Sequence, residues 1–142
     1  MIGLDCNVLV QLAIADHPAH VQTLAAVQAE MLRGTKLVFP SLVATEFLHV
    51  VTDERRFSPP LTMPEALDWI REFLANPAVR LLEPTPAGMD QTPHWLRQFN
   101  LGRKRILDTH LAAILNTNGV RRLLTSNPAD FTVFGVLETL TP

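Results

Sequence analysis

Short apolar runs alternate along the chain with longer segments whose apolar residues recur at helical spacing. The short runs are typical of buried strands, and they lie at residues 2–5, 36–39, 79–82, 122–125 and 135–140. Between them the pattern predicts helices at residues 8–15, 21–32, 41–51, 62–76, 86–100 and 108–116. Strands that alternate with helices favour a mostly parallel sheet with helices on both faces. We therefore predict an α/β fold with three layers, α/β/α.

Three of the predicted helices carry more specific signals. Thr62 and Glu65 have the spacing of a capping box at a helix start, whereas Pro93 should kink the helix over 86–100 or restart it. The helices over 21–32 and 62–76 carry apolar residues at near-helical spacing, and either core packing or a homodimer interface explains them equally well. In the first of these helices the apolar residues are Val21, Leu24, Ala25, Met31 and Leu32, and in the second they are Ala66, Leu67, Ile70, Phe73 and Leu74.

Length and composition narrow the class of protein. The 142 residues fit one domain over residues 1–142 with its own core. Only 18% of the residues are charged and 47% are apolar, which argues against disorder. The sequence has no apolar run of membrane-spanning length and no signal peptide pattern, and its one cysteine, Cys6, suits a reducing cytoplasm. The net charge of −2 gives no global attraction to nucleic acid, so such binding would use local patches.

Three carboxylates that lie far apart in the sequence share a similar setting. Asp5 ends the first predicted strand, at the sheet edge where ligands of open α/β folds collect. Glu46 and Asp108 each have apolar residues three and four positions away, so each lies on the inward face of its own helix. Two acids on inward faces are unusual because unpaired charge is seldom buried.

Carboxylates gathered in this way would repel one another. At about 5 Å and an effective dielectric near 20, each pair costs roughly 3 kcal/mol. A divalent cation would relieve this repulsion, and an oxygen-only ligand set favours Mg²⁺ or Mn²⁺. Simpler interpretations stay open for each residue: Asp5 or Asn7 as a helix cap, Asp108 as an N-cap worth about 1 kcal/mol, and Glu46 as the partner of an arginine.

Basic residues stand directly before Asp108. Arg103, Lys104 and Arg105 would lie at the mouth of the acidic crevice, where an RNA backbone would pass. A solvated basic loop explains these residues equally well. We interpret the arginine pairs at 55–56 and 121–122 as ordinary surface charge.

Four segments together resemble the motifs of PIN domains. Residues 1–10, MIGLDCNVLV, resemble the first motif, an apolar strand that ends in Asp-x-Asn or Asp-x-Ser. The segments SLVATE at 41–46, DTHLAA at 108–113 and LTSNPADF at 124–131 resemble the second, third and fourth. Their order and spacing, and the length of the chain, are similar to those of the VapC-type toxins of bacterial toxin–antitoxin pairs. The resemblance spans essentially the whole chain.

The resemblance implies a Mg²⁺-dependent endoribonuclease with a PIN-like fold and a cognate antitoxin whose tail occupies the acidic crevice. Asp5 and Asp108 would be the principal metal ligands, and Glu46 would hold a second ion or a metal-bound water. Activated water would attack the phosphate in line. The fourth motif departs from the fullest pattern, because many relatives have Asp where Asn127 stands. Asp130, three residues on, could replace it in the catalytic site or could only cap the turn before Phe131.

Three other functions compete with this one. A phosphotransfer enzyme of the haloacid dehalogenase type also starts with a strand ending in Asp, but it wants a second Asp where this chain has Asn7. A receiver-type signalling domain wants paired acids near the first strand and a late lysine, and neither is evident. A binding module that has lost catalysis remains compatible with Asn127.

Overall fold

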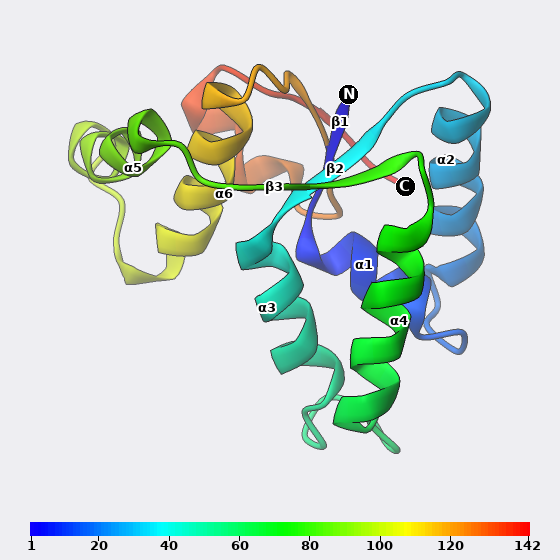
Figure 1. Ribbon diagram of the computed structural model, residues 1–142. Coiled ribbons are helices and arrows are strands. Elements are labelled where there is room, and N and C mark those ends of the chain that lie inside the picture. Colours follow the sequence, from blue (N-terminus) through cyan, green and yellow to red (C-terminus); the bar gives the residue numbers. More distant parts are fainter.

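A single sheet of parallel strands forms the centre of the computed structural model, which describes residues 1–142 (Figure 1). The strand order is β3-β2-β1-β4-β5, and every neighbouring pair is parallel. The prediction of a mostly parallel α/β sheet is therefore confirmed. The strands are β1 (Ile2–Leu4), β2 (Leu37–Pro40), β3 (Val79–Leu82), β4 (Arg122–Leu124) and β5 (Glu138–Leu140).

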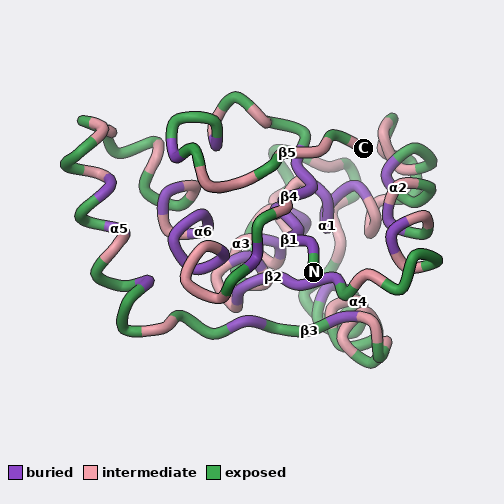
Figure 2. The backbone as a smooth tube through the Cα atoms, turned by 90° about the horizontal axis from the view of Figure 1, so that it is seen from above, coloured by how far each residue is buried: buried purple, intermediate pink, exposed green.

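Helices cover the two faces of this sheet. Seen from above, α5 and α6 lie on one side and α2 and α4 on the other, so the predicted three layers are present (Figure 2). None of the helices combines the length and the apolar composition that crossing a membrane requires. The helices are α1 (Cys6–Ala13), α2 (His20–Leu32), α3 (Ser41–Val51), α4 (Met63–Ala75), α5 (Pro86–Gln98) and α6 (Ile106–Thr117), with 3₁₀ turns η1 (Arg103–Arg105), η2 (Pro128–Asp130) and η3 (Thr132–Phe134).

The helix signals of the sequence have mixed outcomes. The capping box of α4 is present: the Thr62 hydroxyl accepts from Glu65 N at 3.4 Å and the Glu65 carboxylate accepts from Thr62 N at 2.7 Å. By contrast, α5 does not restart at Pro93. The neighbouring Thr92 hydroxyl donates to the Gly88 carbonyl at 2.9 Å and lies 2.8 Å from Nδ1 of His110 in α6. Packing against α6 thus holds this turn together although Pro93 lacks an N–H.

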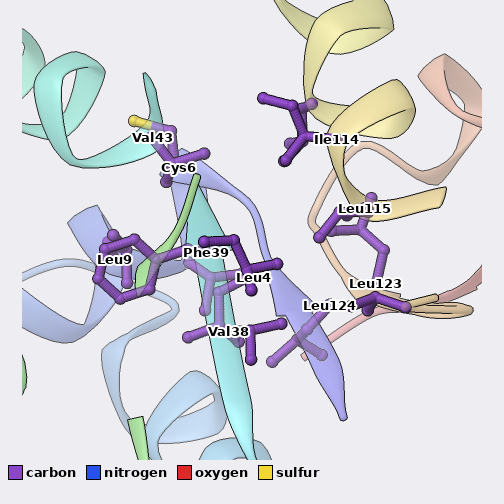
Figure 3. Packing of buried hydrophobic residues seen from close by; sticks show 14 of the residues in the cluster. Leu4, Cys6, Leu9, Val38, Phe39, Val43, Ile114, Leu115, Leu123 and Leu124 are labelled. Atoms are coloured by element: carbon purple, nitrogen blue, oxygen red, sulfur yellow. The ribbon is translucent and has the colours of Figure 1, made fainter. Parts of the chain in front are cut away.

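The core lies where the central strands meet the helices on both sides (Figure 3). Gly3 in β1 leaves room for the Leu115 side chain of α6, because a Cβ there would stand 2.7 Å from Cδ1 of Leu115. A larger residue at this position would require the Leu115 side chain to move. Labelled members of this core in Figure 3 include Leu4, Leu9, Val38, Phe39, Ile114, Leu115, Leu123 and Leu124.

The buried face of α2 differs from the predicted one. Val21 and Leu32 are 77% and 90% exposed, and the fully buried positions are Thr23, Val27 and Glu30. Polar pairs explain the difference, because Thr23 donates to the Gln11 side chain at 2.7 Å and Glu30 binds Arg122 of β4 at 2.8 and 3.0 Å. A helix whose polar residues find partners in the interior can present them inward. Leu24 of α2 and Leu67 of α4 are 38% and 46% exposed. Core packing therefore does not explain these exposed leucines, and the homodimer interpretation stays open for them.

Candidate active site

One large cavity opens at the carboxyl ends of the central strands. Its volume is about 1030 Å³, and Asp5, Glu46, Asp108 and Asn127 all line it. Asp5 directly follows β1, Asn127 follows β4, and Glu46 and Asp108 come from α3 and α6. The parallel sheet therefore brings together four of the five residues predicted for the catalytic site, at the edge where ligands of such folds collect.

A network of donors holds the Asp5 carboxylate in place. Asp5 is the N-cap of α1: its Oδ1 accepts from Cys6 N at 2.7 Å, and its Oδ2 accepts from Asn7 Nδ2 at 2.7 Å and from Thr125 Oγ1 at 2.6 Å. Burial raises the pKa of Asp5 although these hydrogen bonds lower it. Thr125, fully buried, also accepts from Asn127 N at 3.0 Å. Sequence reasoning did not single out Thr125, although its place at the end of the strand beside β1 was the available signal.

Glu46 and Asp108 are half-buried, and neighbouring acids act on both. Burial raises the pKa of Glu46, and repulsion by Asp5 and Asp108 raises it further. For Asp108, burial is again the main cause of the raised pKa, followed by repulsion from Asp130 and Asp5. The cap interpretation holds for Asp5, which serves both as cap and as a wall of the cavity. It is wrong for Asp108, which lies inside the first turn of α6 behind Arg105, the N-cap residue.

Arg105 lies between two acids and is no free cation at the mouth of the cavity. Its Nε is 3.3 Å from Asp108 Oδ2, its Nη1 is 3.7 Å from Asp130 Oδ1, and its Nη2 donates to the Asp130 carbonyl. Only 25% of its side chain is exposed. The structure thus separates the predicted basic run: Arg103 and Lys104 are exposed, and Arg105 neutralises charge beside the site.

Asn127 and Asp130, the two residues predicted for the fourth position of the site, differ in their relation to the cavity. Asn127 is exposed and lines the cavity, whereas Asp130 does not line it. Asp130 is bound by Arg105 and reaches the site through its charge, which raises the pKa values of Asp108 and Asp5. In this arrangement Asp130 does not take the place of a fourth carboxylate in the cavity wall.

The donor set fits a hard divalent cation by its chemistry. No three acidic, cysteine or histidine side chains are arranged to enclose an ion as they stand. Even so, three carboxylates line one cavity, and their mutual repulsion is what a divalent cation relieves. Oxygen ligands of this kind suit Mg²⁺ or Mn²⁺ better than Zn²⁺.

Sequence reasoning missed two residues of the cavity wall that lie outside the predicted motifs. The segment between α3 and α4 brings Arg56 and Phe57 to the cavity that holds the acids. The positive charge of Arg56 acts on Glu46, whose pKa it lowers. Arg56, which we interpreted from the sequence as ordinary surface charge, is 60% exposed and also lines this cavity. No local pattern marks this residue, because its position depends on how a long connection packs.

Comparisons with known proteins give consistent relatives. No model of a protein family matches the chain. The chain is 28% identical over 142 residues to ribonuclease VapC24 of Mycobacterium tuberculosis, of which it covers 97%. It is 30% identical over 115 residues to ribonuclease VapC33 of the same organism, an alignment that covers 80% of this chain and 79% of that one.

Solved structures share the fold at low sequence identity. The toxin VapC20 of M. tuberculosis, which cleaves the sarcin–ricin loop, superimposes with a TM-score of 0.74 at 15% identity over the full length of both chains. A chain of VapBC-1 from Haemophilus influenzae superimposes with a TM-score of 0.69 at 17% identity, with 99% of this chain and 98% of that one covered. The likeness extends over the whole three-layer fold.

Proposed function

The chain belongs to the VapC family of toxin ribonucleases, and on this premise we propose that its cleavage of RNA depends on Mg²⁺ or Mn²⁺ held by Asp5, Glu46 and Asp108. One observation carries the proposal: these three carboxylates line one cavity, where burial raises the pKa of each and the charges of Asp5 and Asp108 raise that of Glu46 further. A bound cation would neutralise charge on the scissile phosphate and lower the pKa of a water molecule.

The residues of the site have distinct tasks in this reaction. Asp5 is held by three hydrogen bonds, so its carboxylate is oriented before the substrate arrives. Glu46 accepts no hydrogen bond from the protein, so its carboxylate is free to bind the cation or a water molecule held by it. Cys6 is no rival nucleophile, because burial, followed by the charges of Glu46 and Asp5, raises the pKa of its thiol far above the usual range.

We also propose the partners of this chain. RNA is the substrate that the family implies, and structures of relatives such as VapBC-1 contain a toxin and its antitoxin. The acidic end of the cavity would attract a cationic side chain of a cognate antitoxin. The exposed Val21, Leu24 and Leu32 of α2 offer an apolar surface for a homodimer. The free Cys6 suits a cytoplasmic location.

A second function, binding of RNA or of a partner without catalysis, is favoured by one observation. Asn127 brings no charge to the cavity, and Arg105 neutralises part of the charge of Asp108 and Asp130. Fewer negative charges would weaken the hold on a cation. RNA cleavage distinguishes the two functions.

The test is cleavage of RNA by the purified chain with Mg²⁺, with Mn²⁺ and with EDTA. We expect cleavage with either metal, none with EDTA, and a loss of about 100-fold or more in Asp5→Asn and Asp108→Asn, since metal-assisted charge stabilisation contributes several kcal/mol. Asp68→Asn is the matched control, because Asp68 lies on the surface of α4 and pairs only with Arg71. If both site variants cleave as fast as the parent chain, the proposal is wrong.

A further inference from the structure

We propose that Arg56 and Phe57 form a nucleotide subsite, in which Arg56 binds a phosphate of single-stranded RNA and Phe57 stacks on the adjacent base. The inference rests on the proposed function, since it describes how the RNA substrate is held at the same cavity. It adds a binding surface that lies outside the four acidic motifs, in the segment between α3 and α4.

The cavity is larger than a cation and one phosphate need. At about 1030 Å³ it has the size of a complete ligand site. Besides the three carboxylates of the site, its lining includes the apolar side chains of Ile14, Val50, Phe57 and Leu61. A strand of RNA carries both chemistries, since each phosphate is followed by a base with an apolar face.

Arg56 has a guanidinium that the protein leaves largely free. The nearest acid, Asp53, is already bound by Arg55, with Nε–Oδ1 and Nη2–Oδ2 distances of 2.9 Å. Arg56 reaches the same carboxylate only at 3.8 Å, and 60% of its side chain is exposed. A guanidinium with unused donors on a cavity wall is suited to bind a phosphate through two parallel hydrogen bonds.

The backbone around Arg56 is fixed before any ligand binds. Arg56 N and Phe57 N both donate to the Asp53 carbonyl, at 2.9 and 3.2 Å, and Leu61 N donates to the Val51 carbonyl at 2.9 Å. Such a preformed segment means that the backbone of Arg56 and Phe57 need not be ordered on binding, which lowers the entropic cost.

Phe57 is the aromatic residue that is available for stacking. Every other aromatic side chain of the chain either pairs with a second ring or, in the case of Phe131, is fully buried. Phe57 is half-buried, packs against the core and lines the cavity without an aromatic partner. An unpaired ring at the edge of a cavity is the kind of platform on which proteins stack unpaired bases.

The charges favour RNA over a basic peptide as occupant of this half of the cavity. Arg56 would repel the cationic side chain that the acidic end attracts, whereas a phosphodiester strand suits both a cation held by the acids and the Arg56 guanidinium. Asp16 lines the cavity from the connection between α1 and α2 and would repel phosphate, which places the phosphate on the Arg56 side.

The test is a binding measurement that needs no catalysis. Fluorescence anisotropy would follow the binding of a short labelled single-stranded RNA, and of a strand of the same length that lacks all bases, in EDTA at several salt concentrations. We expect Arg56→Gln to weaken binding of both strands and to make the slope of log K against log salt shallower by about 0.7, the value for one lost phosphate contact on a single strand. Phe57→Leu keeps apolar packing, and we expect it to weaken only the strand that carries bases, by about 5-fold or more.

Arg71→Gln is the matched control, because it removes the same charge from a surface pair with Asp68 on α4, outside the cavity. The subsite is refuted if Arg56→Gln and Phe57→Leu bind both strands as the parent chain does, or if they weaken only the binding of an antitoxin. Parent protein that cleaves RNA with Mg²⁺ while these variants bind normally would overturn the subsite and leave the proposed function intact. Parent protein that never cleaves, with both binding effects present, would support the subsite and overturn the proposed function.

Discussion

Thr125 donates a hydrogen bond of 2.6 Å from Oγ1 to Oδ2 of Asp5, and both residues stand at the carboxyl ends of adjacent strands. The Thr125 side chain is fully buried, so this bond cannot exchange with water. It links β4 to the most buried carboxylate of the site and lowers the pKa of that carboxylate against the effect of burial. Thr125 is therefore a positioning residue for Asp5.

Thr125→Val keeps the shape of the side chain and removes its hydroxyl. The Asp5 carboxylate then loses a donor, its pKa rises, and its orientation is no longer fixed from β4. We expect cleavage of RNA to fall by roughly 10- to 100-fold, as for partners that orient metal ligands. Initial rates of RNA cleavage measured between pH 5 and 8 would show the rise in the pKa of Asp5, because the acidic limb of the pH–rate profile would shift to higher pH. Thr125→Ser retains a hydroxyl and should restore both the cleavage rate and the position of the acidic limb. Identical pH–rate profiles for Thr125→Val and Thr125→Ser would contradict the positioning role.

A second prediction concerns Glu30 and the acid stability of the fold. The Arg122 guanidinium lowers the pKa of Glu30 to about 2 from a usual value of 4.5. Because the folded-state pKa is the lower one, the stabilisation is complete above about pH 4.5 and is lost as the pH falls from 4.5 towards 2. The Glu30–Arg122 pair joins α2 to β4. It contributes about 2 kcal/mol to the free energy of unfolding once screening at the partly exposed Arg122 is allowed for.

Urea unfolding of the parent chain and of Glu30→Gln at several pH values would measure this effect. The parent should lose stability over that acid range, and the variant should show a smaller pH dependence and a lower stability near neutral pH. Glu138→Gln is the matched control, since Glu138 is 70% exposed and only 4.0 Å from Nε of Arg122. Equal pH dependence in Glu30→Gln and the parent would contradict the prediction.

The same residues show how far the sequence predicts this structure. The helix Ser41–Val51 and the strand Val79–Leu82 have the predicted bounds because apolar spacing and turn residues are local signals. The apolar pattern of α2 does not show that Glu30 lies in the interior, because its partner Arg122 is 92 residues away along the chain. A hydrophobic pattern cannot show such a pair.

The residues of the candidate site also fall into those that the sequence predicts and those that it does not. Asp5, Glu46 and Asp108 were predicted to converge because strand ends and inward helix faces fix where a side chain points. Arg56 lies on a connection whose course depends on tertiary packing. The Arg105 side chain contacts Asp108 and also Asp130, which is 25 residues away in the sequence. Residues on turns and connections have no regular spacing like that of helices and strands, so the sequence does not show where their side chains point.

Arg105 gives a third prediction, on the concentration of metal that activity requires. Its Nε stands 3.3 Å from Asp108 Oδ2, so its positive charge opposes a cation at that carboxylate. We expect Arg105→Gln to lower the Mg²⁺ concentration for half-maximal cleavage by roughly 5-fold, which corresponds to about 1 kcal/mol of removed repulsion. Titration of RNA cleavage with Mg²⁺ measures the change, and Arg103→Gln, an exposed neighbour in the same turn, should alter it much less. A higher Mg²⁺ requirement in Arg105→Gln would instead indicate that Arg105 positions Asp108.

Asn127 supports the last prediction, because it is the one uncharged residue among the four predicted site residues that line the cavity. Asn127→Asp adds a fourth carboxylate near Asp5 and Asp108, which increases the repulsion that a divalent cation relieves. We expect tighter binding of Mn²⁺ by about 10-fold in isothermal titration and faster cleavage at limiting metal. Without metal the added repulsion should lower the melting temperature, so the variant should gain more from added Mn²⁺ than the parent does. Asn100→Asp is the matched control, since Asn100 is an exposed asparagine that does not line the cavity. Equal Mn²⁺ affinity in Asn127→Asp and the parent would show that this corner of the cavity takes no part in holding the ion.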